Sequence, residues 1–161
     1  MPLIIDASQS AGVLEIDFKR LGADFIAMPG HKGLLGPQGT GILLCGREPA
    51  CLMQGGTGSL STEQTMPDFL PDRGEAGTLN VPGIAGLGAG IQYLREKGIN
   101  SVFQKEKKMA EICAHGLRQM GLQVYSGANQ GGTVSFLSGM DCEEMAQWLA
   151  RKNIAVRAGL H

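Results

Sequence analysis

The stretch Phe25-Ile26-Ala27-Met28-Pro29-Gly30-His31-Lys32-Gly33 passes from a short apolar run directly into a polar turn flanked by glycines. A similar change occurs earlier, where the apolar run Leu3–Ile5 ends at Asp6, and Thr40–Cys45 is a third apolar run. Short apolar runs that stop at polar clusters predict buried strands of an α/β sheet. Ligands of open α/β sheets bind at the carboxyl ends of the strands, so Asp6 and the His31-Lys32 pair are expected at one mouth.

The middle of the chain changes from loop to helix. Residues 54–75 show no hydrophobic period and are rich in Gly, Ser, Thr and Pro, which predicts a loop that is either functional or disordered. A helical pattern begins at Pro82 and ends at Gly98, with an apolar face made of Ile84, Leu87, Ile91 and Leu94. Glycines at 83, 86, 88 and 90 are unfavourable in an isolated helix, so they predict close packing against another element.

A change in composition near residues 98–101 predicts two structural units, 1–98 and 99–161. In the second unit we expect an amphipathic helix over 101–120, with Val102, Met109, Ile112 and Leu117 inward. Strands are predicted at 122–125, 133–137 and 154–157, and Asp141 is a good N-cap for a helix over 142–152.

Composition excludes several classes of protein. The 161 residues carry 14 Lys and Arg against 15 Asp and Glu, and this balance argues against a nucleic-acid binder. No apolar run approaches the length of a membrane span and no signal peptide opens the chain, so we expect a soluble, cytoplasmic protein without a membrane partner. The four cysteines form no CxxC pair and no metal-ligand spacing, which predicts reduced thiols and no metal site.

Two clusters could carry chemistry. Asp6 at a strand end is either a functional carboxylate or a turn-capping, solvated one. Lys32 is either an exposed loop lysine or a buried amine. Burial would lower the pKa of the amine and so favour the uncharged form that a Schiff base requires. The residues alone leave both alternatives open.

The spacing of these clusters, with two later blocks, resembles a known family. Asp6-Ala-Ser-Gln-Ser10, Asp24 through Lys32 and Gly36-Pro-Gln-Gly-Thr-Gly41 together resemble the pyridoxal-phosphate segment of class V aminotransferases, in particular the cysteine desulfurase and selenocysteine lyase branch. Arg73-Gly-Glu-Ala-Gly-Thr-Leu-Asn80 and Val156-Arg-Ala-Gly-Leu-His161 are similar to two later family blocks. Three blocks in order across nearly the whole chain make the match specific.

The resemblance implies a fold, a cofactor and roles for residues. The fold would be part of the large domain of a fold-type-I transferase, a mixed sheet with helices, plus part of the small C-terminal α+β domain. Lys32 would hold pyridoxal 5'-phosphate and move protons, Asp6 would keep the ring nitrogen protonated, and Gln9 would hydrogen-bond the ring hydroxyl oxygen. His31 would donate to the phosphate. Thr78 would reach the phosphate of the neighbouring subunit in a homodimer, and Arg157 would line the substrate pocket.

Departures from the family pattern indicate an incomplete site. Pro29 stands where many relatives have a phosphate-binding serine. Family members are more than twice as long, and the half that supplies the stacking ring would precede Met1. The persulfide-forming cysteine would follow His161 directly. We therefore expect this chain to be a central piece of a longer enzyme.

The function implied is cysteine desulfuration, in which L-cysteine gives alanine and an enzyme persulfide that a sulfur-acceptor protein could take up. Transamination and selenocysteine lysis are alternatives within the class, because Asp6, Gln9, His31 and Lys32 serve all of them alike. A different class of hypothesis is a non-catalytic partial fold that associates through exposed surfaces.

Overall fold

The computed structural model describes residues 1–60, 62–128 and 130–159. They fold into two compact units, Met1–Asn100 and Ser101–His161, and each unit is described by itself. Helix α3 (Ile99–Gln119) begins just before the division between them. The assignment of residues 1–98 to a large cofactor domain and of 99–161 to a small domain stays a prediction.

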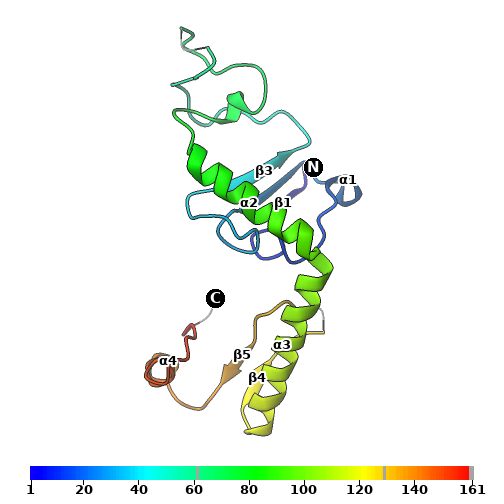
Figure 1. Ribbon diagram of the computed structural model, residues 1–161, viewed down its shortest axis with the longest axis vertical. Coiled ribbons are helices and arrows are strands. Elements are labelled where there is room, and N and C mark those ends of the chain that lie inside the picture. Colours follow the sequence, from blue (N-terminus) through cyan, green and yellow to red (C-terminus); the bar gives the residue numbers. More distant parts are fainter. Residues whose placement is uncertain (61, 129, 160–161) are drawn as a thin grey trace. The chain divides into compact units, whose positions relative to one another are not determined.

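A three-stranded mixed sheet forms the first unit (Figure 1). Strand β1 (Ile4–Asp6) pairs in parallel with β2 (Phe25–Pro29), and β2 pairs antiparallel with β3 (Gly41–Cys45). The three apolar runs therefore become the three strands, and the predicted mixed α/β sheet is confirmed.

The sheet is buried at its centre and open at its edge. Ile26 in β2 is fully buried, whereas Ile4 in β1 is 66% exposed. The expectation of a buried first strand is thus wrong for β1, because β1 is an edge strand of this sheet. The side chain of Asp24 fastens this edge: it accepts the Leu3 backbone N–H at 2.7 Å and pairs with Arg47.

Short helices and one long loop connect these strands to helix α2. Helix α1 (Phe18–Leu21) is capped by the Asp17 side chain and ends at Gly22, where the backbone is left-handed. In the described part of the predicted loop, residues 54–60 and 62–75, the one helical element is a 3₁₀ turn, η1 (Asp72–Gly74). Helix α2 (Val81–Lys97) begins where the Asn80 side chain accepts the Gly83 N–H at 3.1 Å, and it ends at Gly98.

The glycines of α2 have different surroundings. A Cβ at Gly90 would lie 2.5 Å from the Leu34 carbonyl oxygen, and one at Gly86 would lie 3.2 Å from Pro37. The loop that follows Lys32 therefore packs directly on the helix backbone, as predicted for these two positions. A Cβ at Gly88 would have no atom within 4 Å, and one at Gly83 would meet only Asn80, the N-cap of α2. These two glycines therefore do not contact the loop.

Gly90→Ala is expected to destabilise the fold by about 1–3 kcal/mol, because the added methyl has no space beside the Leu34 carbonyl. Gly88→Ala is the matched control, since its Cβ enters open space and alanine improves a helix interior by up to about 1 kcal/mol. Urea unfolding of both variants measures the two shifts, and shifts of the same sign would contradict the packing argument.

The second unit contains α3, a two-stranded antiparallel sheet and helix α4 (Figure 1). Strand β4 (Gln123–Tyr125) pairs with β5 (Ser135–Leu137), with Val124 opposite Phe136. Helix α4 (Cys142–Ala150) starts at Asp141, whose side chain accepts the N–H groups of Glu143 and Glu144 as predicted. The helix face expected on α3 is partly wrong: Ala114 is its buried residue, while Met109 and Ile112 are each more than half exposed.

The strand predicted at residues 154–157 is also wrong. The segment has no strand structure, and the Ile154 N–H instead donates to the Leu149 carbonyl at 3.0 Å, which continues the turn after α4. A strand requires a neighbour to pair with, and this local hydrogen bond diverts its first donor. None of the helices in the described ranges is both long and apolar enough to cross a membrane.

Candidate functional site

The candidate site lies where the parallel strands β1 and β2 end. Asp6 is opposite Ala27 in the register, and the Ala7 N–H donates to the Ala27 carbonyl at 2.8 Å. Because the two strands run in the same direction, the turns that follow Asp6 and Pro29 leave the sheet at one edge. The predicted common mouth for Asp6 and the His31-Lys32 pair is confirmed.

Asp6 is held in a local turn by Ser8. Its Oδ1 accepts the Ser8 backbone N–H at 2.9 Å and also the Ser8 hydroxyl. These two hydrogen bonds, the hydroxyl first, lower the pKa of Asp6 below its ordinary value of 3.8; desolvation opposes them in part, and the charge of Lys32 adds the smallest lowering effect. The Asp6 carboxylate is therefore ionised and lies within electrostatic reach of the Lys32 ammonium.

The loop that carries His31 and Lys32 is closed by backbone hydrogen bonds. Gly30 donates to the Thr40 carbonyl at 2.8 Å, Gly36 donates to Gly30 at 2.7 Å, and Leu35 donates to Lys32 at 2.9 Å. Gly30 is buried, but the side chains of His31 and Lys32 are exposed. The burial considered for Lys32 is thus absent, because the lysine lies past the end of β2 in a turn that projects from the sheet.

The turns after β1 and β2 touch through glycine backbones. A Cβ on Gly12 would overlap the Gly33 carbonyl, and one on Gly33 would overlap the Ala11 carbonyl. Gly12 also has a φ of +82°, a conformation that other residues rarely adopt. This contact places the turn that bears Asp6 and the exposed Gln9 directly against the one that bears Lys32.

Thr78 and Arg157 belong to other segments of the chain. Thr78 is exposed and follows Gly77, whose N–H donates to the carbonyls of Gly55 and Gly56. Within the described ranges, no hydrogen bond or ion pair joins Thr78 to Asp6 or Lys32. Arg157 is exposed and belongs to the second unit. Leu160 and His161, which complete the third sequence block, lie outside the described residues.

Sequence reasoning did not identify Ser8 as the partner of Asp6. The Asp-x-Ser spacing was the available signal, because an aspartate side chain commonly bonds the backbone N–H two residues later. Among the described residues no group of three or more His, Cys, Asp or Glu could hold a metal. The four cysteines are free thiols.

Ser8→Ala is expected to raise the pKa of Asp6 toward 3.8, because it removes the largest cause of the lowering. An ionised group with a lowered folded pKa stabilises the fold above its unfolded pKa, and this contribution is lost as the pH falls through the folded pKa. The variant should therefore lose that contribution at a higher pH than the parent chain does. Carboxyl ¹³C titration measures the midpoint, and Ser10→Ala, next in the same turn, should leave it unchanged.

Comparison with known proteins identifies the family of the chain. The family model described as Aminotransferase class-V matches residues 1–161. A protein of Methanothermobacter thermautotrophicus named "Probable cysteine desulfurase" is 38% identical over 98% of this chain, which corresponds to 42% of the relative. The apo cysteine desulfurase of Thermococcus onnurineus shares the fold with a TM-score of 0.84 at 35% identity, over 98% of this chain and 42% of that one.

A further solved relative shows the cofactor. A C-DES structure with glycine covalently linked to its pyridoxal-phosphate cofactor matches 92% of this chain and 42% of its own, with a TM-score of 0.75 at 28% identity. The chain thus spans about two fifths of the length of these relatives. Its mixed sheet and helices form part of the fold of pyridoxal-phosphate-dependent transferases. From the match over its whole length, the chain belongs to the class V aminotransferase family, whose cofactor is pyridoxal phosphate.

Proposed function

We propose that this chain carries the cofactor-binding centre of a cysteine desulfurase, with Lys32 as the residue that holds pyridoxal phosphate. The observation that supports it most is the position of an ionised Asp6 and of Lys32 after the ends of two parallel strands, in turns whose backbones touch at Gly12 and Gly33. Because the chain matches the family over its whole length, we expect Asp6 and Lys32 to bind the cofactor of that family.

The donors and acceptors present fit the cofactor. A carboxylate with a lowered pKa accepts hydrogen bonds only, so Asp6 suits a protonated ring nitrogen and would keep that nitrogen charged. When bound, pyridoxal phosphate supplies an electron sink for the bond that is broken at the substrate. Lys32 would hold the group through its Nζ and then move a proton as general acid and base. The Ser8 hydroxyl and N–H keep Asp6 oriented and ionised throughout.

The remaining residues would bind and orient. Gln9 would hydrogen-bond the ring hydroxyl oxygen, and His31 would donate to the phosphate. Pro29 has neither a hydroxyl nor an N–H, so this position can donate no hydrogen bond to the phosphate. Thr78 would serve the phosphate of a second copy, and Arg157 would support the substrate pocket.

L-Cysteine is the proposed substrate, because these relatives are named cysteine desulfurases. Selenocysteine lysis and transamination remain the alternatives, because the same four site residues serve them. In the longer enzyme, alanine formed in step with sulfide from L-cysteine would support desulfuration. Amino transfer to a keto acid without sulfide would overturn it in favour of transamination, and turnover of selenocysteine alone would favour the lyase.

The cofactor assignment is tested by absorption spectroscopy. Pyridoxal phosphate added to the chain should give a visible band, and borohydride followed by peptide mapping should place the label on Lys32. Label scattered over exposed lysines would contradict the assignment for this chain and would support a non-catalytic partial fold.

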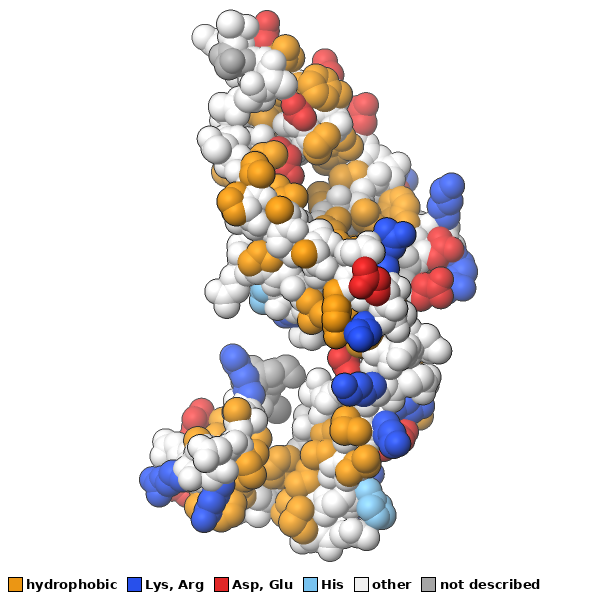
Figure 2. All heavy atoms as spheres, viewed as in Figure 1, with side chains coloured by type: hydrophobic (Ala, Val, Ile, Leu, Met, Phe, Trp, Pro, Cys, Tyr) orange, Lys and Arg blue, Asp and Glu red, His pale blue; other side chains and the backbone are white. Residues whose placement is uncertain are grey.

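We also propose that the partner at the Thr78 segment is a second copy of the chain. Three apolar side chains near Thr78 are strongly exposed: Leu52 by 98%, Met53 by 70% and Val81 by 65%. Figure 2 shows apolar side chains gathered over α2 and the loop that precedes it. Sedimentation should detect a dimer that Val81→Glu weakens, whereas a monomer at all concentrations would contradict this proposal. A sulfur-acceptor protein and a cytoplasmic location stay predictions from the sequence.

A further inference from the structure

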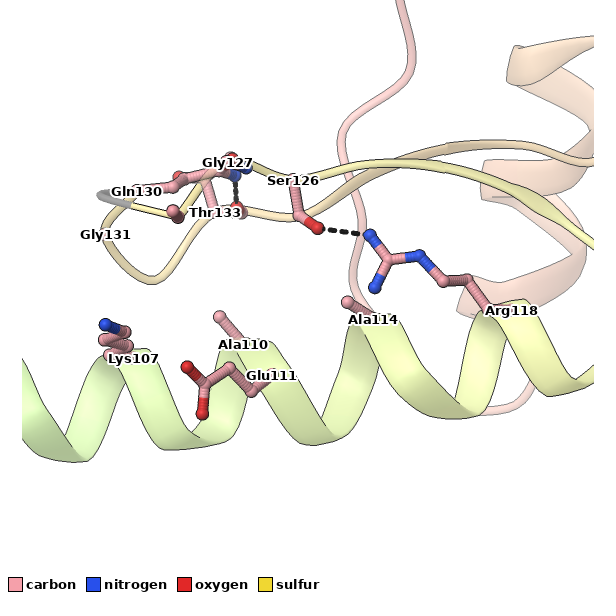
Figure 3. A pocket seen from close by; sticks show the side chains of 11 residues that line it. Lys107, Ala110, Glu111, Ala114, Arg118, Ser126, Gly127, Gln130, Gly131 and Thr133 are labelled. Atoms are coloured by element: carbon pink, nitrogen blue, oxygen red, sulfur yellow. Dashed lines mark hydrogen bonds between the residues drawn. The ribbon is translucent and has the colours of Figure 1, made fainter.

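A cavity in the second unit belongs to no part of the proposed cofactor site. It has a volume of about 330 Å³ and lies between α3 and the loop over 126–133 (Figure 3). Its lining from α3 comes from one stripe of the helix: Lys107, Ala110, Glu111, Ala114 and Arg118. Pockets of this size take small organic ligands.

The stripe places a cation at each end, with two alanines and the carboxylate of Glu111 between them. Ala110 and Ala114 lie between Lys107 and Arg118, which are separated by about 16 Å along the helix axis at 1.5 Å per residue. Both side chains are long enough to shorten this gap. Figure 3 shows the Arg118 guanidinium extended along the cavity toward Ser126, to whose hydroxyl its Nη2 donates at 2.5 Å.

The charges of the cavity are not neutralised by ion pairs. Within the described ranges, neither Lys107 nor Glu111 forms an ion pair or a hydrogen bond, and Arg118 keeps donors beyond the one used for Ser126. Glu106, the other nearby carboxylate, packs against Gly132 and does not line the cavity.

Hydrogen bonds of one side chain join residues of the segment that lines the cavity opposite α3. The Gln130 side chain accepts the Gly127 N–H at 2.6 Å and donates to the Thr133 carbonyl, so one amide bridges both sides of the loop. These hydrogen bonds restrain Gly127, Gln130 and Thr133, so these residues lose less conformational freedom on binding, which favours affinity for a small ligand.

We propose that this cavity binds a small elongated dicarboxylate. One carboxylate meets the planar fork of Arg118 beside Ser126, the methylene chain lies on Ala110 and Ala114, and the other carboxylate meets Lys107. The guanidinium fork matches carboxylate geometry, whereas the lysine acts as a point charge. Glu111 lies between the two cations and opposes the binding of anions.

Glutarate binding to the full chain, followed by NMR shifts and calorimetry, tests the proposal. Arg118→Gln and Lys107→Gln should each weaken glutarate about tenfold, since each removes a charge-assisted hydrogen bond. Glu111→Gln should tighten it. Lys108→Gln is the matched control: it removes the same charge from the same helix outside the cavity and should change affinity by less than about twofold.

Acetate provides the second comparison, because it can occupy only one end of the cavity and should bind much more weakly than glutarate. The proposal is overturned if glutarate does not saturate, if acetate binds as tightly, or if Lys108→Gln weakens glutarate as much as Lys107→Gln. Circular dichroism verifies the fold of each variant. If Arg118→Gln does not fold, the opposite signs expected for Lys107→Gln and Glu111→Gln still decide the question.

Discussion

Lys32→Ala is expected to abolish the borohydride-trapped pyridoxal label on this chain. If the proposed function holds, an active enzyme that contains this chain should lose at least about a thousandfold in sulfide release, because the substitution removes both the amine that holds the cofactor and the group that moves the proton. Absorption spectra and sulfide release measure the two effects. Lys19→Ala in α1 is the matched control, since it removes an exposed lysine of the same unit without touching the site.

Lys32→Arg separates the charge of the lysine from its amine. Arginine retains a positive charge near Asp6, but its guanidinium stays protonated and forms no Schiff base with the cofactor. We therefore expect both Lys32→Arg and Lys32→Ala to lose the label and to retain most of the lowering of the Asp6 pKa, because the Ser8 hydrogen bonds cause most of it. Only Lys32→Ala should lose the small part that the lysine charge contributes. A label of ordinary yield in Lys32→Ala would show that another lysine holds the cofactor.

The fold was predictable where hydrophobic runs and turn chemistry agree. The first three strands, the ends of α2 and the Asp141 cap follow from apolar runs, glycines and capping side chains that act over a few residues. The exposed faces of β1 and α3 were not predictable in this way. Exposure depends on which elements lie alongside, and the apolar residues Ile4 and Ile112 read the same whether or not they are covered.

The site, like the fold, was predictable from the sequence only in part. Strand direction and the polar ends of β1 and β2 predicted the meeting of Asp6 with Lys32, because the carboxyl ends of parallel strands share an edge. The exposure of Lys32 and the bond from Ser8 to Asp6 depend on side-chain placement in the turns. The roles of Thr78 and Arg157 came from the family resemblance alone, so these two residues stay proposals.

The contact between the two site turns leads to the prediction with the largest effect on stability. Gly12→Ala should cost about 2–4 kcal/mol, because an added methyl overlaps the Gly33 carbonyl and the φ of +82° is unfavourable for alanine. Gly39→Ala isolates the second cause, since Gly39 has a φ of +76° but nothing within 4 Å. It should cost only about 1–2 kcal/mol.

The same substitution should also alter the chemistry of the site. If the turns separate, Lys32 moves away from Asp6, so the pKa of Asp6 should rise slightly and the label on Lys32 should fall in yield. Gly39→Ala should change neither, because Gly39 lies in neither contact surface. Urea unfolding, carboxyl titration and label yield measure the three effects together. Equal unfolding free energies for the two variants would mean that backbone conformation alone, and not the approach of Gly12 to Gly33, requires glycine at position 12.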